Sequence, residues 1–160
     1  GAILSFDPNI REPLWKDMED ARTQMAYGLS VCDILKISDN EIQWFSGKED
    51  YTEGIHMLQQ TYQIPLILLS MGKDGSRAYY KDMLVEVPAF LQKNTIEATG
   101  AGDTFGACCL HHILKYGLDN LTKQQLKEML TFANAAASII TTRKGALRVM
   151  PSLEEIQRLL

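Results

Sequence analysis

The amino-acid sequence predicts a layered α/β fold. Short apolar segments alternate with longer amphipathic segments, the order expected when strands and helices follow one another along a chain. The chain has 160 residues, of which 46% are hydrophobic and 22% are charged. This length fits one domain whose core needs no disulfide or metal, and the composition excludes a disordered or collagen-like chain.

The first half of the chain begins with a predicted strand at 2–7. The turn-forming residues Asp7-Pro8-Asn9 end it. Apolar residues at three- and four-residue spacing then predict a helix from Pro13 to Leu29. The elements expected next are a strand at 34–37, a short helix that Ser38 or Asp39 caps and that runs through Phe45 until Gly47 stops it, a helix at 51–62 and a buried strand at 65–70.

The second half begins with a predicted hairpin, whose strands at 77–80 and 84–88 flank Lys81-Asp82. A long helix is expected from the glycine-rich residues 100–102 to Tyr116, and a second one at 123–141. Ser152 and Glu155 have the spacing of a capping box and predict a terminal helix. No repeat, linker or domain boundary is evident.

The charge, the apolar stretches and the cysteine content indicate which partners and which compartment the protein has. The net charge of −4 argues against nucleic acid or an anionic membrane surface, because either would require a concentrated positive face. The longest apolar stretch, 64–69, is too short to span a bilayer. Three cysteines cannot all pair, which favours a reducing cytoplasm.

The segment Thr99-Gly100-Ala101-Gly102-Asp103-Thr104 carries the strongest chemical signal. Its glycines precede an apolar helix, so main-chain N–H groups at the helix start can bind an anion. A carboxylate beside a phosphate is explained if Asp103 takes a proton from a hydroxyl that attacks the phosphoryl group. The alternative from spacing alone is that Asp103 is an ordinary first-turn helix residue, favoured by the helix dipole.

The glycines at 100, 102 and 106 also approach the spacing of a dinucleotide-binding loop. That loop requires a hydrophobic strand directly before it, and 95–99 is polar. This interpretation is therefore weak.

The nine residues 97–105, Glu-Ala-Thr-Gly-Ala-Gly-Asp-Thr-Phe, resemble the second signature of the PfkB/ribokinase carbohydrate kinases. Further segments resemble that family in the same order: Asp7-Pro8-Asn9-Ile10-Arg11 with Leu14-Trp15, 35–41 at the place of the N-x-x-E motif, 70–76 for T-x-G-x-x-G, and 133–137 with 142–146 for the adenine and cation loops. The resemblance implies a three-layer ribokinase-like fold with a mostly parallel central sheet.

By this resemblance the chain is the ATP-binding and catalytic-base portion of a sugar kinase, most similar to a fructokinase. Asp103 would be the general base and would face the sugar, and Gly100, Ala101 and Gly102 would present N–H groups to the transferred phosphoryl. The other implied roles are Glu41 near Mg²⁺ through water, Ser70, Gly72 and Gly75 at the ATP phosphates and ribose, Asn134 and Gly145 at the adenine, and Arg11 at the sugar.

The resemblance covers nearly the whole chain but only the C-terminal half of a family member. Gly1 opens into an apolar run with no initiator Met and no signal-peptide pattern. An edge strand or a tag remnant would explain this start, and a missing sugar-binding and lid portion is the interpretation that the resemblance favours. Residues 1–160 alone are then expected to be inactive.

Two departures from the family pattern bear on cofactors. Ser38 stands where the motif has Asn, and its hydroxyl can still hold water. Glu97 stands where relatives have an Asp that helps to bind a monovalent cation, which leaves potassium activation open. A 2-keto-3-deoxygluconate kinase and a truncated, non-catalytic nucleotide-binding module are the alternative functions, and a homodimer is one option for assembly.

Overall fold

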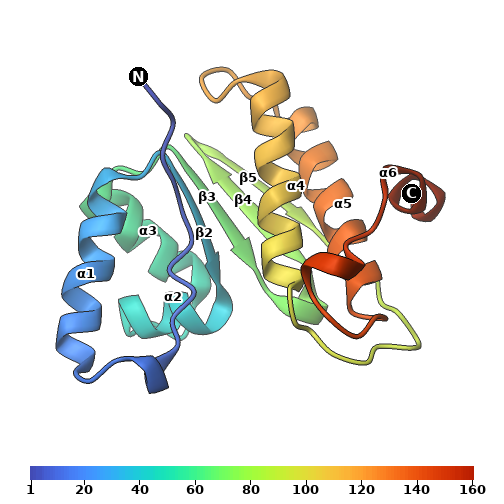
Figure 1. The fold of residues 1–160 in the computed structure, drawn as a ribbon. Helices are drawn as coiled ribbons and strands as arrows, with labels where there is room; N and C mark the ends of the chain where they lie inside the picture. The colour runs from blue at the N-terminus through green and yellow to red at the C-terminus, as the bar shows by residue number, and fades with distance from the viewer. The chain divides into compact units, whose positions relative to one another are not determined.

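Strands and helices alternate along most of the chain in the computed structural model, which describes residues 1–160 (Figure 1). The strands form one sheet in the order β1-β2-β3-β4-β5, which confirms the predicted α/β class. The elements are β1 (Ser5–Phe6), α1 (Met18–Val31), β2 (Ile34–Ser38), α2 (Asp39–Ser46), α3 (Tyr51–Tyr62), β3 (Leu66–Ser70), β4 (Ser76–Tyr80), β5 (Met83–Val87), α4 (Ala101–Tyr116), α5 (Lys123–Ile140) and α6 (Leu153–Leu159), with 3-10 turns at Glu12–Leu14, Gly72–Asp74 and Leu147–Val149.

The chain divides into two compact units. Unit 1 comprises residues 1–70 and 79–82, and unit 2 comprises residues 71–78 and 83–160. Each unit is described by itself below.

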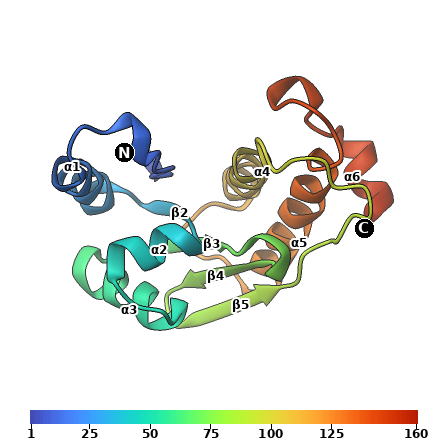
Figure 2. The same cartoon turned by 90° about the horizontal axis from the view of Figure 1, so that it is seen from below.

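Unit 1 is built on three parallel strands. β1 pairs with β2, and β2 pairs with β3 in a register that places Ile34 beside Leu66 and Ser38 beside Ser70. The helices α1, α2 and α3 lie on one face of these strands, as expected when successive right-handed crossovers advance in one direction (Figures 1 and 2). Phe6 of β1 packs so closely on α1 that a Cβ at Gly28 would lie 2.5 Å from its ring.

Unit 2 is built on two long helices that lie side by side, α4 and α5 (Figures 1 and 2). α5 also contacts β5, and its fully buried alanines let the helix approach its neighbours closely. α6 packs through Ile156 against Ala135 and Ala136 of α5.

Along the chain, the two residues Lys81-Asp82, which belong to unit 1, join β4 to β5 as the sequence predicts.

The N-terminal elements are shorter than expected. Only Ser5 and Phe6 of the predicted strand at 2–7 form a ladder. The predicted helix at 13–29 is divided into a 3-10 turn and α1, because the Asp17 side chain accepts a hydrogen bond from the Glu19 N–H and starts a new helix there. Helix-period patterning cannot show such an interruption, since Leu14 and Met18 keep the spacing on both sides of it.

None of the helices combines the length and the apolar character that crossing a bilayer requires.

The loop between α5 and α6 is held by one arginine. Arg143 donates to the Val149 carbonyl oxygen at 3.0 Å and, at short distance, to the Glu155 carboxylate. Glu155 also accepts from the Ser152 N–H at 2.8 Å, which closes the predicted capping box of α6. The hydrogen bond from Ser152, and next the one from Arg143, lower the pKa of Glu155.

We therefore expect acid to loosen α6. A carboxyl whose folded pKa is lowered contributes stability that is complete above its unfolded pKa, about 4.3, and is lost as pH falls through the folded pKa. As pH falls from about 6 to about 3, the protection of the Ile156 and Leu160 amides against exchange, expressed relative to the intrinsic exchange rate at each pH, should fall in the wild type. Glu155→Gln should remove most of this loss of protection.

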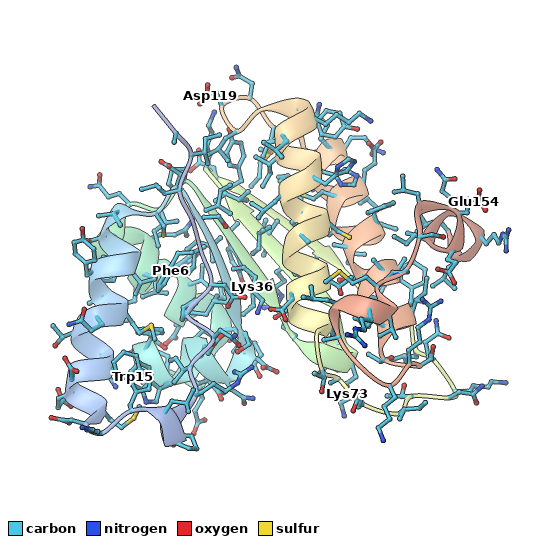
Figure 3. The ribbon with its side chains drawn as sticks, in the orientation of Figure 1. Phe6, Trp15, Lys36, Lys73, Asp119 and Glu154 are labelled. Carbon is cyan, nitrogen blue, oxygen red and sulfur yellow. The ribbon has the colours of Figure 1, made fainter.

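Glu154→Gln is the matched control. Figure 3 labels Glu154 on the same helix, where its ion pair with Arg158 spans 3.6 Å between exposed side chains. Ion pairs between exposed side chains contribute little to the stability of the fold. An equal loss of pH dependence in both variants would contradict the assignment to Glu155.

Candidate functional site

Three neighbouring parallel strands of unit 1 end in polar residues. Asp7 follows β1, Ser38 ends β2 and Ser70 ends β3. The register places Ser38 beside Ser70, and the Ser70 hydroxyl lies 3.5 Å from the Ile37 carbonyl oxygen that it donates to. Together with Glu41 these residues form what we call the strand-end cluster. Carboxyl ends of parallel strands are where α/β proteins gather ligand contacts.

Glu41 is held in place on both carboxylate oxygens. Oε2 accepts from the Ser38 N–H at 2.9 Å and from the Ser38 hydroxyl at 2.7 Å, and this pairing is the capping box of α2. Oε1 accepts from the Ile10 N–H at 2.8 Å. The residue is 9% exposed, so only a small part of the carboxylate is accessible, enough for contact through water.

Lys36 joins this cluster although sequence reasoning missed it. Its ammonium group lies 3.1 Å from the Asp7 carboxylate, and its side chain is only 10% exposed (Figure 3). A buried lysine requires such a partner. The signal available in the sequence was a lysine inside the apolar strand 34–37.

Arg11, predicted to face the sugar, lies in the segment between β1 and the first 3-10 turn. Its guanidinium is exposed and donates to the neighbouring Ile10 carbonyl oxygen at 3.2 Å. The structure thus places Arg11 one residue after the contact to Glu41, with its fork directed to no group of the strand-end cluster.

The start of α4 differs from the start of every other α-helix in the chain. Helices α1, α2, α3, α5 and α6 each have a side chain that accepts from a first-turn N–H, whereas α4 begins at Gly100 with no side-chain cap. Thr104 N–H reaches the Gly100 carbonyl oxygen, and Ala101 N–H reaches that of Ala98. The N–H groups of Gly102 and Asp103 remain without an acceptor and are available to an anion.

Asp103 follows directly in this first turn. Its side chain is exposed and has no hydrogen-bond or ion-pair partner in residues 1–160, so both carboxylate oxygens can receive a proton. The next residue, Thr104, is 3% exposed and its hydroxyl also has no partner.

Gly100 lies against the loop that carries Gly145. A Cβ at Gly100 would be 3.2 Å from the Ala146 Cβ, and its φ of 78° lies in the left-handed region. The Glu97 carboxylate accepts from the Gly145 N–H at 2.7 Å. Unit 2 therefore brings together Glu97, Gly100 and Gly145, three positions from two of the predicted motifs.

Gly75 and Asn134 meet at the end of β5. A Cβ at Gly75 would lie 2.2 Å from the Val87 carbonyl oxygen, and the Asn134 amide donates to the carbonyl oxygens of Val87 and Pro88 at 3.1 Å each. Gly72 begins the 3-10 turn that Gly75 follows, but it has open space around it. Asn134 thus spends its N–H donors on the backbone and keeps only its oxygen for a ligand.

No group of three or more His, Cys, Asp or Glu side chains is arranged to hold a metal ion. Mg²⁺ commonly keeps several waters and is held by one or two carboxylates and by substrate phosphates, so it needs no such cage. Glu41 Oε1, which accepts one hydrogen bond, fits contact with Mg²⁺ through water.

Comparison with known proteins agrees with this arrangement. A family model described as pfkB family carbohydrate kinase matches residues 1–153. Fructokinase-1 of Zea mays is 35% identical over 160 residues, covering 100% of this chain and 49% of that protein. Putative fructokinase-8 of Arabidopsis thaliana is 36% identical over 152 residues, covering 95% of this chain and 72% of that protein. The chain thus spans about half the length of Zea mays fructokinase-1 and a larger share of the Arabidopsis protein.

Solved structures show the same fold. The fructokinase of Vibrio cholerae O395, solved with fructose, ADP and calcium ion, superposes with a TM-score of 0.90 at 27% identity and covers 100% of this chain and 51% of its own. The fructokinase of Xylella fastidiosa with bound ATP has a TM-score of 0.85 at 28% identity, covering 99% of this chain and 52% of its own. These matches confirm the predicted ribokinase-like fold.

The crowding at Gly75 gives a test of the loop that follows β3. Gly75→Ala should lower the free energy of unfolding by about 2–6 kcal/mol, because a φ of 98° adds strain of about 1–3 kcal/mol to an overpacking cost of about 1–3 kcal/mol. Urea denaturation measures this change.

Gly72→Ala is the matched control, since its φ of 54° is also left-handed but nothing lies within 4 Å of the new Cβ. It should cost only about 1–2 kcal/mol. Equal losses in the two variants would show that backbone strain, and not the contact with Val87, decides this position.

Proposed function

The chain belongs to the pfkB family of carbohydrate kinases, and on that basis we propose that it forms the ATP-binding and catalytic-base portion of an ATP-dependent fructokinase. The proposed reaction transfers the γ-phosphoryl group of MgATP to a hydroxyl of fructose. Fructose is proposed because the relatives and solved structures described above are fructokinases, and one of those structures is named as holding fructose.

The observation that carries the proposal is the uncapped start of α4. Two N–H groups without acceptors and the positive end of a 16-residue helix favour a negatively charged group at that point. A side-chain cap would occupy these N–H groups, as in the other helices. Gly100 instead leaves them for the transferred phosphoryl group.

Asp103 supplies the matching base. Its carboxylate takes the proton of the sugar hydroxyl while the hydroxyl oxygen forms a bond to the γ-phosphorus. The bond from that phosphorus to the β,γ-bridging oxygen breaks, and ADP leaves with the electron pair. The N–H groups of Gly102 and Asp103 stabilise the negative charge on the transferred group throughout.

Mg²⁺, when bound, would neutralise charge on the phosphate oxygens. Glu41 would hold it through water, Ser70, Gly72 and Gly75 would line the phosphates and ribose, and Asn134 and Gly145 would lie at the adenine. Two observations support these roles. Gly75 lies so close to the Val87 carbonyl oxygen that a side chain would not fit, and the Gly145 N–H donates to the Glu97 carboxylate, so the loop that carries each glycine is held against a neighbouring segment.

Replacing the proposed base tests the mechanism. In the protein that carries this chain, Asp103→Asn should lower kcat by about a hundredfold or more, the usual cost of losing a general base. The Kd for ATP, measured by calorimetry, should stay close to that of the wild type because Asn keeps the size of the side chain.

Glu53→Gln serves as the control, since Glu53 is also an exposed first-turn carboxylate, at the start of α3. This variant also removes a negative charge from the first turn of a helix but leaves the proposed base intact, so it shows how much of any change in kcat comes from the loss of charge alone. Fructose-dependent ADP release near the wild-type rate in Asp103→Asn would refute the assignment.

Arg11 tests the sugar side of the proposal. Its guanidinium can donate two parallel hydrogen bonds to hydroxyls or a carboxylate, so Arg11→Ala should raise the KM for the sugar much more than the KM for ATP. Assays with fructose and with 2-keto-3-deoxygluconate would also distinguish the two candidate substrates. Lys16→Ala, an exposed cation five positions further, should change neither KM; a shift confined to the ATP KM in Arg11→Ala would place Arg11 at the nucleotide.

A further inference from the structure

Glu41 makes one hydrogen bond that its helix cap does not require. A capping box needs the carboxylate only for the N-cap residue, and Oε2 provides this by accepting twice from Ser38. The bond from the Ile10 N–H to Oε1 reaches a residue 31 positions earlier in the chain. It therefore fixes a different segment of unit 1.

That segment, residues 8–11, has no regular secondary structure of its own. Asn9 has a φ of 44°, a left-handed conformation that Asn tolerates but that persists only where surrounding contacts hold it. The Lys36–Asp7 ion pair holds the segment at its beginning, and the Glu41–Ile10 hydrogen bond holds it immediately before Arg11. The exposed guanidinium of Arg11 donates to the carbonyl oxygen of Ile10 itself, so its place depends on this backbone.

We propose that Glu41 is a positioning residue for Arg11: its Oε1 fixes the backbone at Ile10, and so aims the guanidinium at the sugar, while its Oε2 caps α2. This inference rests on the proposed function for the role of Arg11. One carboxylate then connects the start of α2, on the proposed phosphate side, with the segment on the proposed sugar side.

A second capping box in the same chain shows how to separate the two tasks. In α5 the corresponding residue is Gln125, whose single side-chain oxygen accepts from both the N–H and the hydroxyl of Thr122. A glutamine at 41 can therefore close the same box on Ser38. Its amide NH₂ would then face the Ile10 N–H, and two donors cannot bond to each other.

Glu41→Gln is thus expected to release Ile10 and to keep the cap. By NMR on the full chain, amide exchange at Ile10 should speed up about threefold to tenfold, the effect of losing one hydrogen bond, while the amides of α2 change less than about twofold. The matched variant Ser38→Ala should do the reverse, speeding exchange in the first turn of α2 and leaving Ile10 protected. Unchanged exchange at Ile10 in Glu41→Gln would overturn the proposal.

Kinetics of the protein that carries this chain then test the link to Arg11. Glu41→Gln should raise the sugar KM about threefold to tenfold, and more than the ATP KM. In an Arg11→Ala background the same substitution should leave the sugar KM nearly unchanged, because residues that act as one unit are not additive. A sugar KM that does not move in Glu41→Gln, or that moves fully in the Arg11→Ala background, would overturn the positioning role. A wild-type protein that phosphorylates no sugar would refute the proposed function instead, and exchange at Ile10 would then decide on the contact alone.

Discussion

The left-handed conformation of Gly100 is the constraint on which the candidate site of unit 2 depends. Its φ is 78°, and a Cβ at this position would lie 3.2 Å from the Ala146 Cβ. Both the backbone conformation and the limited space therefore favour glycine. A glycine offers no side chain to cap the helix, so the same constraint that lets the chain turn into α4 also leaves first-turn N–H groups without acceptors. The hydrogen bond from Gly145 to Glu97 fastens the neighbouring loop to the segment that leads into this turn.

At the strand ends of unit 1, in contrast, the polar groups have hydrogen-bond or charge partners. There the N-terminus of α2 is closed by Ser38 and Glu41, and the polar groups are paired with one another. Lys36 and Asp7 follow the same rule, because a lysine with only 10% of its side chain exposed needs a charge partner. Paired groups hold a shape, whereas the unpaired groups at α4 are available for chemistry.

The sequence predicted best the features that depend on nearby residues. The capping box of α6, the end of α4 at Tyr116 and the turn at Lys81-Asp82 all follow from residues a few positions apart, and the structure contains each of them. It also indicated the glycine-rich start of α4, since residues 97–105 resemble a family signature.

Features that join distant segments were not predictable in this way. Neither the Lys36–Asp7 ion pair nor the Ile10–Glu41 hydrogen bond, which spans 31 positions, leaves a periodic pattern in the sequence. The resemblance placed Glu41 beside a metal but could not show that three donors occupy its oxygens. It also offered the N–H of Ala101 to a ligand, whereas the structure commits that group to Ala98.

The contrast between Glu41 and Asp103 explains why one carboxylate suits proton transfer and the other does not. A base needs an accessible oxygen with a free lone pair directed at the incoming hydroxyl. Glu41 is 9% exposed, and three donated hydrogen bonds already direct its oxygens toward Ser38 and Ile10, so accepting a proton there would require the cap or the Ile10 contact to break. Asp103 gives up no such bond, since its exposed oxygens have no partner within the chain. The surroundings of these two acidic residues therefore suit Glu41 to the proposed role of holding the backbone and Asp103 to the proposed role of base.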